Sequence, residues 1–164
     1  MHACTMSMDH LLETVRAFDG VLELAPDKDS AFPEIAWGDH FFYYAPDGEV
    51  PLREQPYATI VTKNYPDDTT SDLDDPNRWR LNIHVGTEAF VRLTGENPRD
   101  EPAPRDAAAA DVVLPHPVYR AQGWISIINP GPRTDRLAVR LLRRAHEDAK
   151  RRAERRSVSH PDGD

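Results

Sequence analysis

The sequence predicts an α+β fold, a two-layer sandwich in which an antiparallel sheet of about five strands carries helices on one face. Three observations lead to this class. Residues 79–85 alternate between apolar and polar side chains, as a half-buried strand does. Tight-turn residues such as those at 46–48 separate consecutive strand-like stretches, which favours antiparallel pairing. Apolar residues at helical spacing complete the order: helix, three strands, helix, two strands, helix.

The N-terminal part begins with an expected helix over residues 8–18, which Ser7 can cap. Residues 21–24 could form a short strand, and residues 25–34 are an acidic, proline-containing loop. Two strand-like stretches follow at residues 38–44 and 57–62, both rich in aromatic or β-branched side chains. A long acidic loop over residues 64–77 then leads to the next strand.

Residues 79–85 form the expected central strand of the sheet. One of its faces is apolar, and we expect this face to pack against the helices. The opposite face carries Arg80, Asn82 and His84. A slip of one residue would bury the arginine and expose the apolar set, so the alternation fixes the register of this strand.

The C-terminal part contains two short strands between two helices. Thr87 is expected to cap a short helix that Gly95 ends. A proline-rich surface connection at residues 96–110 precedes strands at 112–114 and 123–128. Thr134 is expected to cap a long helix, whose buried stripe consists of Leu137, Leu141, Leu142, Ala145 and Ala149. We assign one domain to residues 1–156 and a disordered tail to residues 157–164.

Charge and composition restrict the classes of function. Ten basic and four acidic residues between positions 133 and 156 give this segment +6, whereas the whole chain carries −8 and the remainder therefore −14. So acidic a body repels phosphate backbones, and we expect no nucleic-acid binding unless the basic helix acts alone. No apolar run is long enough for a membrane span, and no secretory leader is visible. With Cys4 as the single cysteine, we expect a cytoplasmic protein without membrane contact.

Several short motifs resemble those of known proteins. They are Gly38 to Tyr43, Pro56 to Val61, Ser71 to Asp74, Arg80 to Ile83, and His116 to Tyr119 with Gln122 to Trp124. With the element order, they make residues 8 to 155 resemble the MmcQ/YjbR-like proteins, and more closely a family of uncharacterised bacterial proteins of that fold. The resemblance implies a secretion-chaperone-like α+β fold and a role of that group in DNA binding. The chain departs from the group at residues 120–123, which are less basic than expected.

The polar face of the central strand is a candidate ligand surface. If the loops at 64–77 and 96–110 fold over it, Arg80 could hold a carboxylate or phosphate with two hydrogen bonds and Asn82 could orient a polar ligand. The alternative is a solvated sheet face on which Arg80 pairs with a loop aspartate.

The segment His116-Pro117-Val118-Tyr119, followed by Trp124, is a second candidate. A histidine held between two prolines could anchor a ligand or act as a general base, with Tyr119 as a further proton carrier. Alternatively, the prolines and the tryptophan only shape a strand entry and fill the core. We therefore predict ligand contacts by Arg80, Asn82, His116, Tyr119 and Trp124.

Metal and catalytic sites are less well supported by the residue pattern. His40, His84 and His116, with Asp39, are the metal-capable side chains that the strands could bring together, but their spacing fits no recognised metal motif, and we expect neither a metal nor another cofactor. The leading hypothesis is a binding protein for a small polar or anionic ligand or a protein partner. Pairing of an exposed edge strand could also give a homodimer.

Two further hypotheses belong to other functional classes. One is a small enzyme of secondary metabolism that uses His116 or His84 as acid or base, with Asp39 as the orienting group. The other is DNA binding through the basic C-terminal helix.

Overall fold

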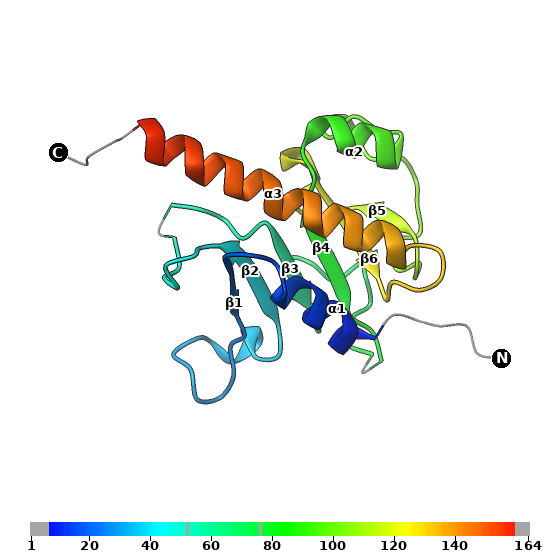
Figure 1. Cartoon of the computed structure of the whole chain (residues 1–164). Coiled ribbons are helices and arrows are strands. Elements are labelled where there is room, and N and C mark those ends of the chain that lie inside the picture. The colour runs from blue at the N-terminus through cyan, green and yellow to red at the C-terminus, as the bar shows by residue number, and fades with distance from the viewer. Residues whose placement is uncertain (1–6, 52, 76, 160–164) are drawn as a thin grey trace.

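The structure, a computed structural model, describes residues 7–51, 53–75 and 77–159 (Figure 1). Cys4 and residues 160–164 lie outside the described residues. The elements follow one another as α1 (Met8–Arg16), β1 (Val21–Leu24), η1 (Glu34–Ala36), β2 (His40–Tyr44), β3 (Ala58–Val61), β4 (Arg80–His84), α2 (Thr87–Thr94), β5 (Val113–Pro115), η2 (Arg120–Gln122), β6 (Trp124–Ile128) and α3 (Asp135–Ser159).

The strands form one open antiparallel sheet in the order β1-β2-β3-β4-β6-β5. The α+β class and the antiparallel sheet are thus confirmed, but the prediction of about five strands is wrong, because the described residues form six. The additional strand is β1, which pairs with β2 from Val21 opposite Tyr44 to Leu24 opposite Phe41. Four residues are too few to show a clear alternation, so β1 can be identified as a strand only from its pairing with β2.

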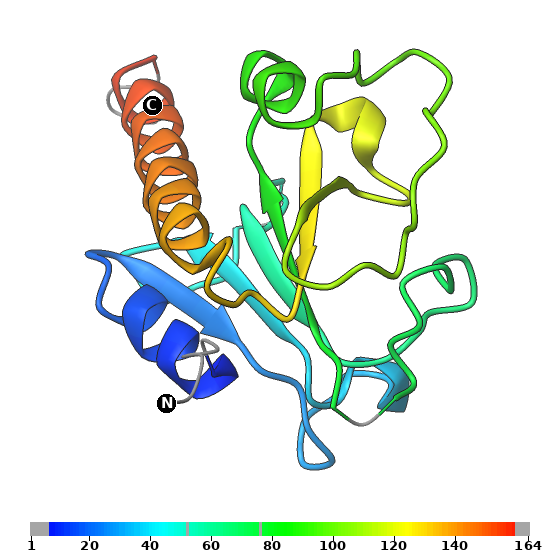
Figure 2. The ribbon, with the colours of Figure 1, turned by 90° about the vertical axis from the view of Figure 1, so that its right-hand side faces the viewer.

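Helices α1 and α3 lie on one face of the sheet, and the long loops lie on the other (Figure 2). The apolar side of the sheet and these helices bury a common core, in which Leu11, Phe42, Ile60, Ile83 and Leu142 have no exposed surface. Each such side chain contributes roughly 1.5–3 kcal/mol to folding by its transfer out of water. Helix α2 packs against β5 and adds Phe90 to the same core.

Of three residues expected at helix ends, two are confirmed in that role and one is not. Ser7 caps α1 by accepting the backbone N–H of His10 at 3.1 Å, and Gly95 ends α2 in the left-handed conformation, both as predicted. Thr87 does not cap α2. It is the first helical residue, and the cap is Gly86, whose φ of +86° suits a residue without Cβ.

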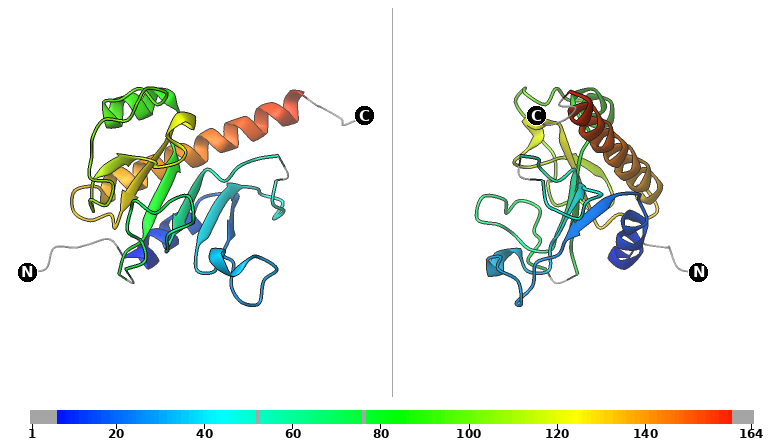
Figure 3. Two further views of the ribbon diagram at one scale, coloured as in Figure 1. Left: turned by 180° about the vertical axis from the view of Figure 1, so that it is seen from behind. Right: turned by 60° about the vertical axis from the view of Figure 1, so that its left-hand side comes forward.

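Helix α3 continues to Ser159, three residues into the segment that was expected to be a tail. The sequence explains the longer helix: no glycine or proline follows Asp135 until Pro161, and the arginines near the end are favourable at the negative end of the helix dipole. The C-terminal part of α3 reaches beyond the strands (Figure 3). None of the helices in the described part of the chain has the length and apolar character to cross a membrane.

Candidate functional site

The face of the sheet opposite α1 and α3 contains a cavity of about 400 Å³. Alternate side chains of β2, β3 and β4 form its floor, among them Phe41, Thr59 and Asn82. Loop 64–77 and residues 116–119 border it. The volume lies within the range of roughly 300–1,000 Å³ that small-molecule sites occupy.

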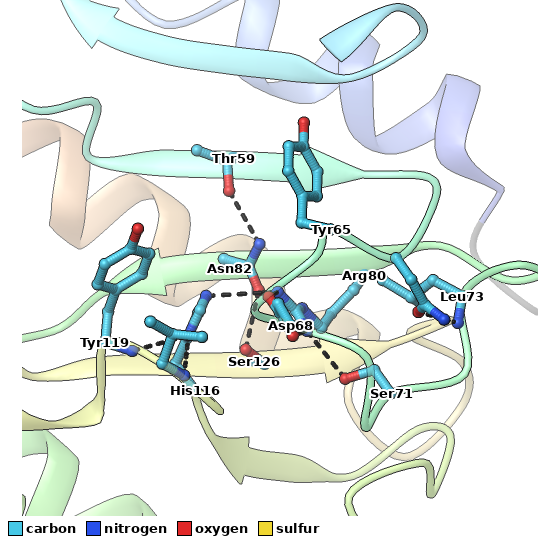
Figure 4. Close-up of polar contacts among 12 residues, drawn as sticks. Thr59, Tyr65, Asp68, Ser71, Leu73, Arg80, Asn82, His116, Tyr119 and Ser126 are labelled. Carbon is cyan, nitrogen blue, oxygen red and sulfur yellow. Dashed lines mark hydrogen bonds and ion pairs between the residues drawn. The ribbon is translucent and has the colours of Figure 1, made fainter. Parts of the chain in front are cut away.

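Hydrogen bonds within loop 64–77 hold it over the sheet. The backbone N–H of Asn64 donates to Asp74 at 3.0 Å, and the Asn64 side chain accepts the N–H of Leu73 at 2.9 Å. Leu73 is buried, and Tyr65 and Asp68 exchange backbone hydrogen bonds. These contacts place the Asp68 carboxylate over β4 (Figure 4).

Arg80 lies under this loop and is only 1% exposed. Its Nη1 donates to Asp68 Oδ1 and to Ser71 Oγ, both at 2.9 Å, and its Nη2 donates to Asp68 Oδ2. Burial raises the pKa of Asp68, but the hydrogen bonds and charge of Arg80 outweigh it and hold that pKa below its usual value. Arg80 thus pairs with a loop aspartate, as the alternative interpretation expected, but the face is buried rather than solvated. The two hydrogen bonds that Arg80 was expected to donate to a ligand carboxylate go to the carboxylate of Asp68 instead.

Asn82 connects three neighbouring strands. Its Oδ1 accepts Arg80 Nε at 2.7 Å and the Ser126 hydroxyl at 2.8 Å, and its Nδ2 donates to Thr59 Oγ1 at 2.9 Å. Since Arg80 only donates, the atom that faces it must be the amide oxygen. Thr59, Asn82 and Ser126 are opposite one another in the sheet register, so all three lie on the same face.

His116 is 3% exposed and approaches Arg80 from the segment after β5. Its Nδ1 accepts the backbone N–H groups of Val118 and Tyr119, both at 3.0 Å. Burial, followed by the charge of Arg80, lowers the pKa of His116 to about 3, against the opposing influence of Asp68. The imidazole is therefore neutral at neutral pH, and Nδ1 is its unprotonated nitrogen, because a backbone amide always carries its hydrogen.

Aromatic side chains line much of the cavity. The ring centroid of Tyr119 lies 4.9 Å from that of His116, and Trp124 approaches His116 edge-on at 6.3 Å. Tyr119 is 50% exposed, whereas Trp124 is 8% exposed. Phe41 and Tyr43 of β2 line the cavity as well. A flat apolar body would find ring faces and edges to pack against here.

All five residues predicted to contact a ligand, Arg80, Asn82, His116, Tyr119 and Trp124, line this one cavity. Two histidine candidates lie elsewhere. His84, at the end of β4, lines a different hollow with residues of α2 and α3, and its ring centroid is 5.7 Å from that of Trp124. His40 bonds to Glu23 of β1 at 2.7 Å.

Asp39 is also outside the cavity lining and orients neither His116 nor His84. Its buried carboxylate accepts from the backbone and hydroxyl of Thr62, from Lys63 and from the Tyr65 hydroxyl. The three histidine candidates therefore do not converge. Among the residues that the structure describes, no group of three metal-capable side chains could hold an ion.

Loop 96–110 borders a smaller, adjacent cavity of about 210 Å³ instead of the main one. Of the two loops that were expected to fold over the polar face of β4, only loop 64–77 therefore borders the main cavity. His116 lines both cavities. Sequence reasoning missed Asp68, Ser71, Thr59 and Ser126. The register of β3 and β6 against β4 could have identified Thr59 and Ser126, but nothing in the sequence distinguishes Asp68 from the other acids of its loop.

Comparison with known proteins identifies the family. A family of unknown function, DUF6194, matches residues 6–158. The chain belongs to the DUF6194 family. No curated protein and no solved structure matches it. For this DUF6194 protein, the resemblance to MmcQ/YjbR-like proteins stays a prediction.

Proposed function

We propose that this DUF6194 protein binds a small molecule in the cavity on the polar face of β4. One observation carries the proposal: residues from separate elements, including Arg80, Asn82 and His116, bring buried polar groups to the floor of a cavity with largely apolar and aromatic walls. A few convergent polar groups within an apolar hollow are typical of small-molecule sites.

A screen of planar aromatic fragments tests this function. Binding should raise the melting temperature and shift the indole N–H resonance of Trp124, assigned with Trp124→Phe. Tyr119→Ala should weaken the best fragment by about tenfold, because it removes an aromatic wall of the cavity. Phe32→Ala is the matched control, since Phe32 is a similarly exposed aromatic at 44% that does not line the cavity.

Two outcomes would contradict the binding function. One is that no fragment in the screen shifts the Trp124 resonance or the melting temperature. The other is that Tyr119→Ala and Phe32→Ala affect binding equally.

The enzymatic alternative has less support. His116 is the one histidine candidate at the cavity, but its Nδ1 is occupied by two backbone amides and its low pKa makes it a weak base. No hydrogen bond among the described residues joins it to a carboxylate. Tyr119 remains the half-exposed proton carrier that an enzyme would have available.

The predictions about location and partners also remain open proposals. DNA binding through α3 competes with contacts to the acidic body of the same chain: Arg156 pairs with Glu54 at 2.7 Å, and Lys150 lies 3.8 Å from Asp19. One partner of each pair is exposed to solvent, so the pairs contribute little stability. A homodimer through an edge strand would use β1 or β5, the outer strands of the sheet. Cytoplasmic location stays a prediction.

A further inference from the structure

Three N–H groups converge on the imidazole of His116. The amides of Val118 and Tyr119 approach Nδ1, and Nη2 of Arg80 lies 3.4 Å from Nε2. A neutral imidazole has one unprotonated nitrogen and can accept on one side only. The ring therefore cannot satisfy Arg80 and the two amides at the same time.

The distances decide which contact is not a true hydrogen bond. Placing the proton on Nε2 keeps both 3.0 Å amide bonds, whereas the opposite tautomer would keep only the 3.4 Å contact with Arg80. An N–H donor normally approaches its acceptor to about 2.7–3.2 Å, so the longer contact fits two donors that lie beside each other without a hydrogen bond between them. Nε2 of His116 and Nη2 of Arg80 thus each direct an N–H without an acceptor among the described residues.

These two donors can share one acceptor atom. An oxygen about 2.9 Å from both nitrogens would satisfy His116 and Arg80 together. Both residues line the main cavity, from which such an atom can approach. Both are also at least nine-tenths buried, with exposures of 3% and 1%, so a donor left unpaired here is unfavourable.

The other polar groups on the cavity floor also leave hydrogen-bond donors, rather than acceptors, available to a ligand. Both Asp68 oxygens face Arg80, and the Asn82 oxygen accepts from Arg80 and Ser126. The Asn82 amide nitrogen has two hydrogens, of which one reaches Thr59. Since Thr59 accepts that bond, its own hydroxyl hydrogen is available for a ligand. The floor therefore favours a ligand that accepts hydrogen bonds.

Charge distinguishes a neutral acceptor from an anion. Asp68 already balances the charge of Arg80, His116 is uncharged at neutral pH, and Asp67 adds a negative charge at the exposed border. The chain as a whole carries −8, which also disfavours the approach of an anion. A carbonyl oxygen has the required lone pairs without a net charge.

We propose that the cavity binds a neutral, planar compound through a carbonyl oxygen that accepts from His116 Nε2 and Arg80 Nη2. This assignment rests on the proposed binding function and names the chemical class of its ligand. The carbonyl oxygen lies at the floor between the two donors, and the planar body packs between the aromatic walls that include Tyr119 and Trp124.

The tautomer of His116 gives a test that needs no ligand. Long-range proton–nitrogen NMR on histidine-labelled wild-type protein should show Nε2 protonated and Nδ1 unprotonated at neutral pH. The His116 resonances are assigned by their loss in His116→Phe. Protonation of Nδ1, or a charged ring at neutral pH, would overturn the donor pair whatever the cavity binds.

Three probes of similar shape test the ligand class: acetophenone, benzoate and toluene. Acetophenone should bind about tenfold more tightly than toluene, the gain of roughly one to two hydrogen bonds, and should shift the Nε2 resonance. Benzoate should bind more weakly than acetophenone. His116→Phe should abolish the preference for acetophenone, whereas His84→Phe, outside the cavity, should leave it unchanged.

The outcomes separate this assignment from the binding function itself. Equal affinity for toluene and acetophenone would show that the donor pair holds only water, and preference for benzoate would show an anion site. Either result overturns the carbonyl assignment and leaves the cavity as a binding site. Failure of every fragment in the screen described above would instead overturn the proposed function.

Discussion

Arg80 and Asp68 meet end to end, with Nη1 donating to Oδ1 at 2.9 Å and Nη2 donating to Oδ2. Their side chains are 1% and 10% exposed, so the pair lies almost out of water. It joins loop 64–77 to β4 and so closes one side of the cavity. Removal of either partner would leave an uncompensated charge in the protein interior.

Asp68→Ala should therefore lower the free energy of unfolding by about 3 kcal/mol, the usual cost of leaving a buried charge unpaired. Asp67→Ala is the matched control, because its side chain is exposed and neighbours Asp68 in the chain, and it should change stability by less than about 0.5 kcal/mol. Urea unfolding followed by circular dichroism measures both. Equal effects of the two substitutions would show that the ion pair contributes no special stability.

The depressed pKa of His116 predicts a loss of stability in mild acid. Its pKa is about 3 in the folded protein and 6.5 in its ordinary state, so below pH 6.5 the unfolded chain takes up a proton that the folded protein does not. The contribution of neutral His116 is complete above pH 6.5 and is lost as the pH falls toward 3. His84 and His146 also have lowered pKa values and act in the same direction.

A comparison of the wild type with His116→Gln isolates the contribution of His116 to the pH dependence of stability. The free energy of unfolding of the wild type should fall more steeply than that of the variant between about pH 6.5 and pH 4, measured by urea titration at each pH. Asp68 contributes little there, because its pKa lies below the ordinary value of 3.8 and its effect is lost only in stronger acid. Parallel curves for the two proteins would contradict a neutral, buried His116.

The sequence predicts well what depends on local periodicity. Alternation along β4 correctly assigns Arg80 and Asn82 to one face and Leu81 and Ile83 to the helix-covered core. Residues on the same face of adjacent strands lie close together, which explains why Arg80, Asn82 and Trp124 line one cavity. His116 and Tyr119 reach this cavity from the loop after β5, where no such periodicity applies. By contrast, β1 has four residues, and its pairing with β2 depends on the tertiary structure.

The path of a loop has no such periodicity. Loop 64–77 contains five aspartates, and composition alone makes each an equal partner for Arg80. The choice of Asp68 follows from the Asn64 contacts and the buried Leu73, which exist only in the folded loop. The partners of Asp39 also depend on the path of the chain outside the strands. The sequence predicted Asp39 beside a histidine, but it bonds to Thr62, Lys63 and Tyr65, which follow β3.

His146 gives a prediction on the helix side of the sheet. It is 2% exposed in α3, where Nε2 donates to the Asp19 carbonyl at 2.7 Å and Nδ1 accepts the Tyr57 hydroxyl at 3.0 Å. His146→Phe would leave both groups unpaired and should lower the free energy of unfolding by about 2 kcal/mol or more. Glu147→Ala, an exposed change in the same helix, should have little effect.

A double-mutant cycle identifies the source of the His146 effect. In a Tyr57→Phe background, His146→Phe should cost about 1 kcal/mol less, because the hydroxyl that needs an acceptor is already absent. Chemical denaturation of the four proteins measures the coupling. A cost that is the same in both backgrounds would mean that the Tyr57 contact does not stabilise the protein.

The approach of Gly123 to Gly86 gives a last prediction, at the joint between β4, α2 and β6. The backbone N–H groups of Val85 and Gly86 both donate to the Gly123 carbonyl, and a Cβ on Gly123 would lie 2.9 Å from Gly86 backbone atoms. Gly123 also has a φ of +85°. Gly123→Ala should therefore destabilise the protein by about 1–2 kcal/mol for the left-handed backbone and about 1–3 kcal/mol more for the clash.

Gly48→Ala separates these two costs. Gly48 has a similar φ of +79°, but a Cβ there would meet no atom within 4 Å, so only the backbone cost should appear. Thermal and urea unfolding of both variants give the difference between them. If Gly123→Ala is no more destabilising than Gly48→Ala, the two backbones must be able to separate without loss of the carbonyl contacts, and the start of α2 is less rigidly fixed to β6 than the close approach indicates.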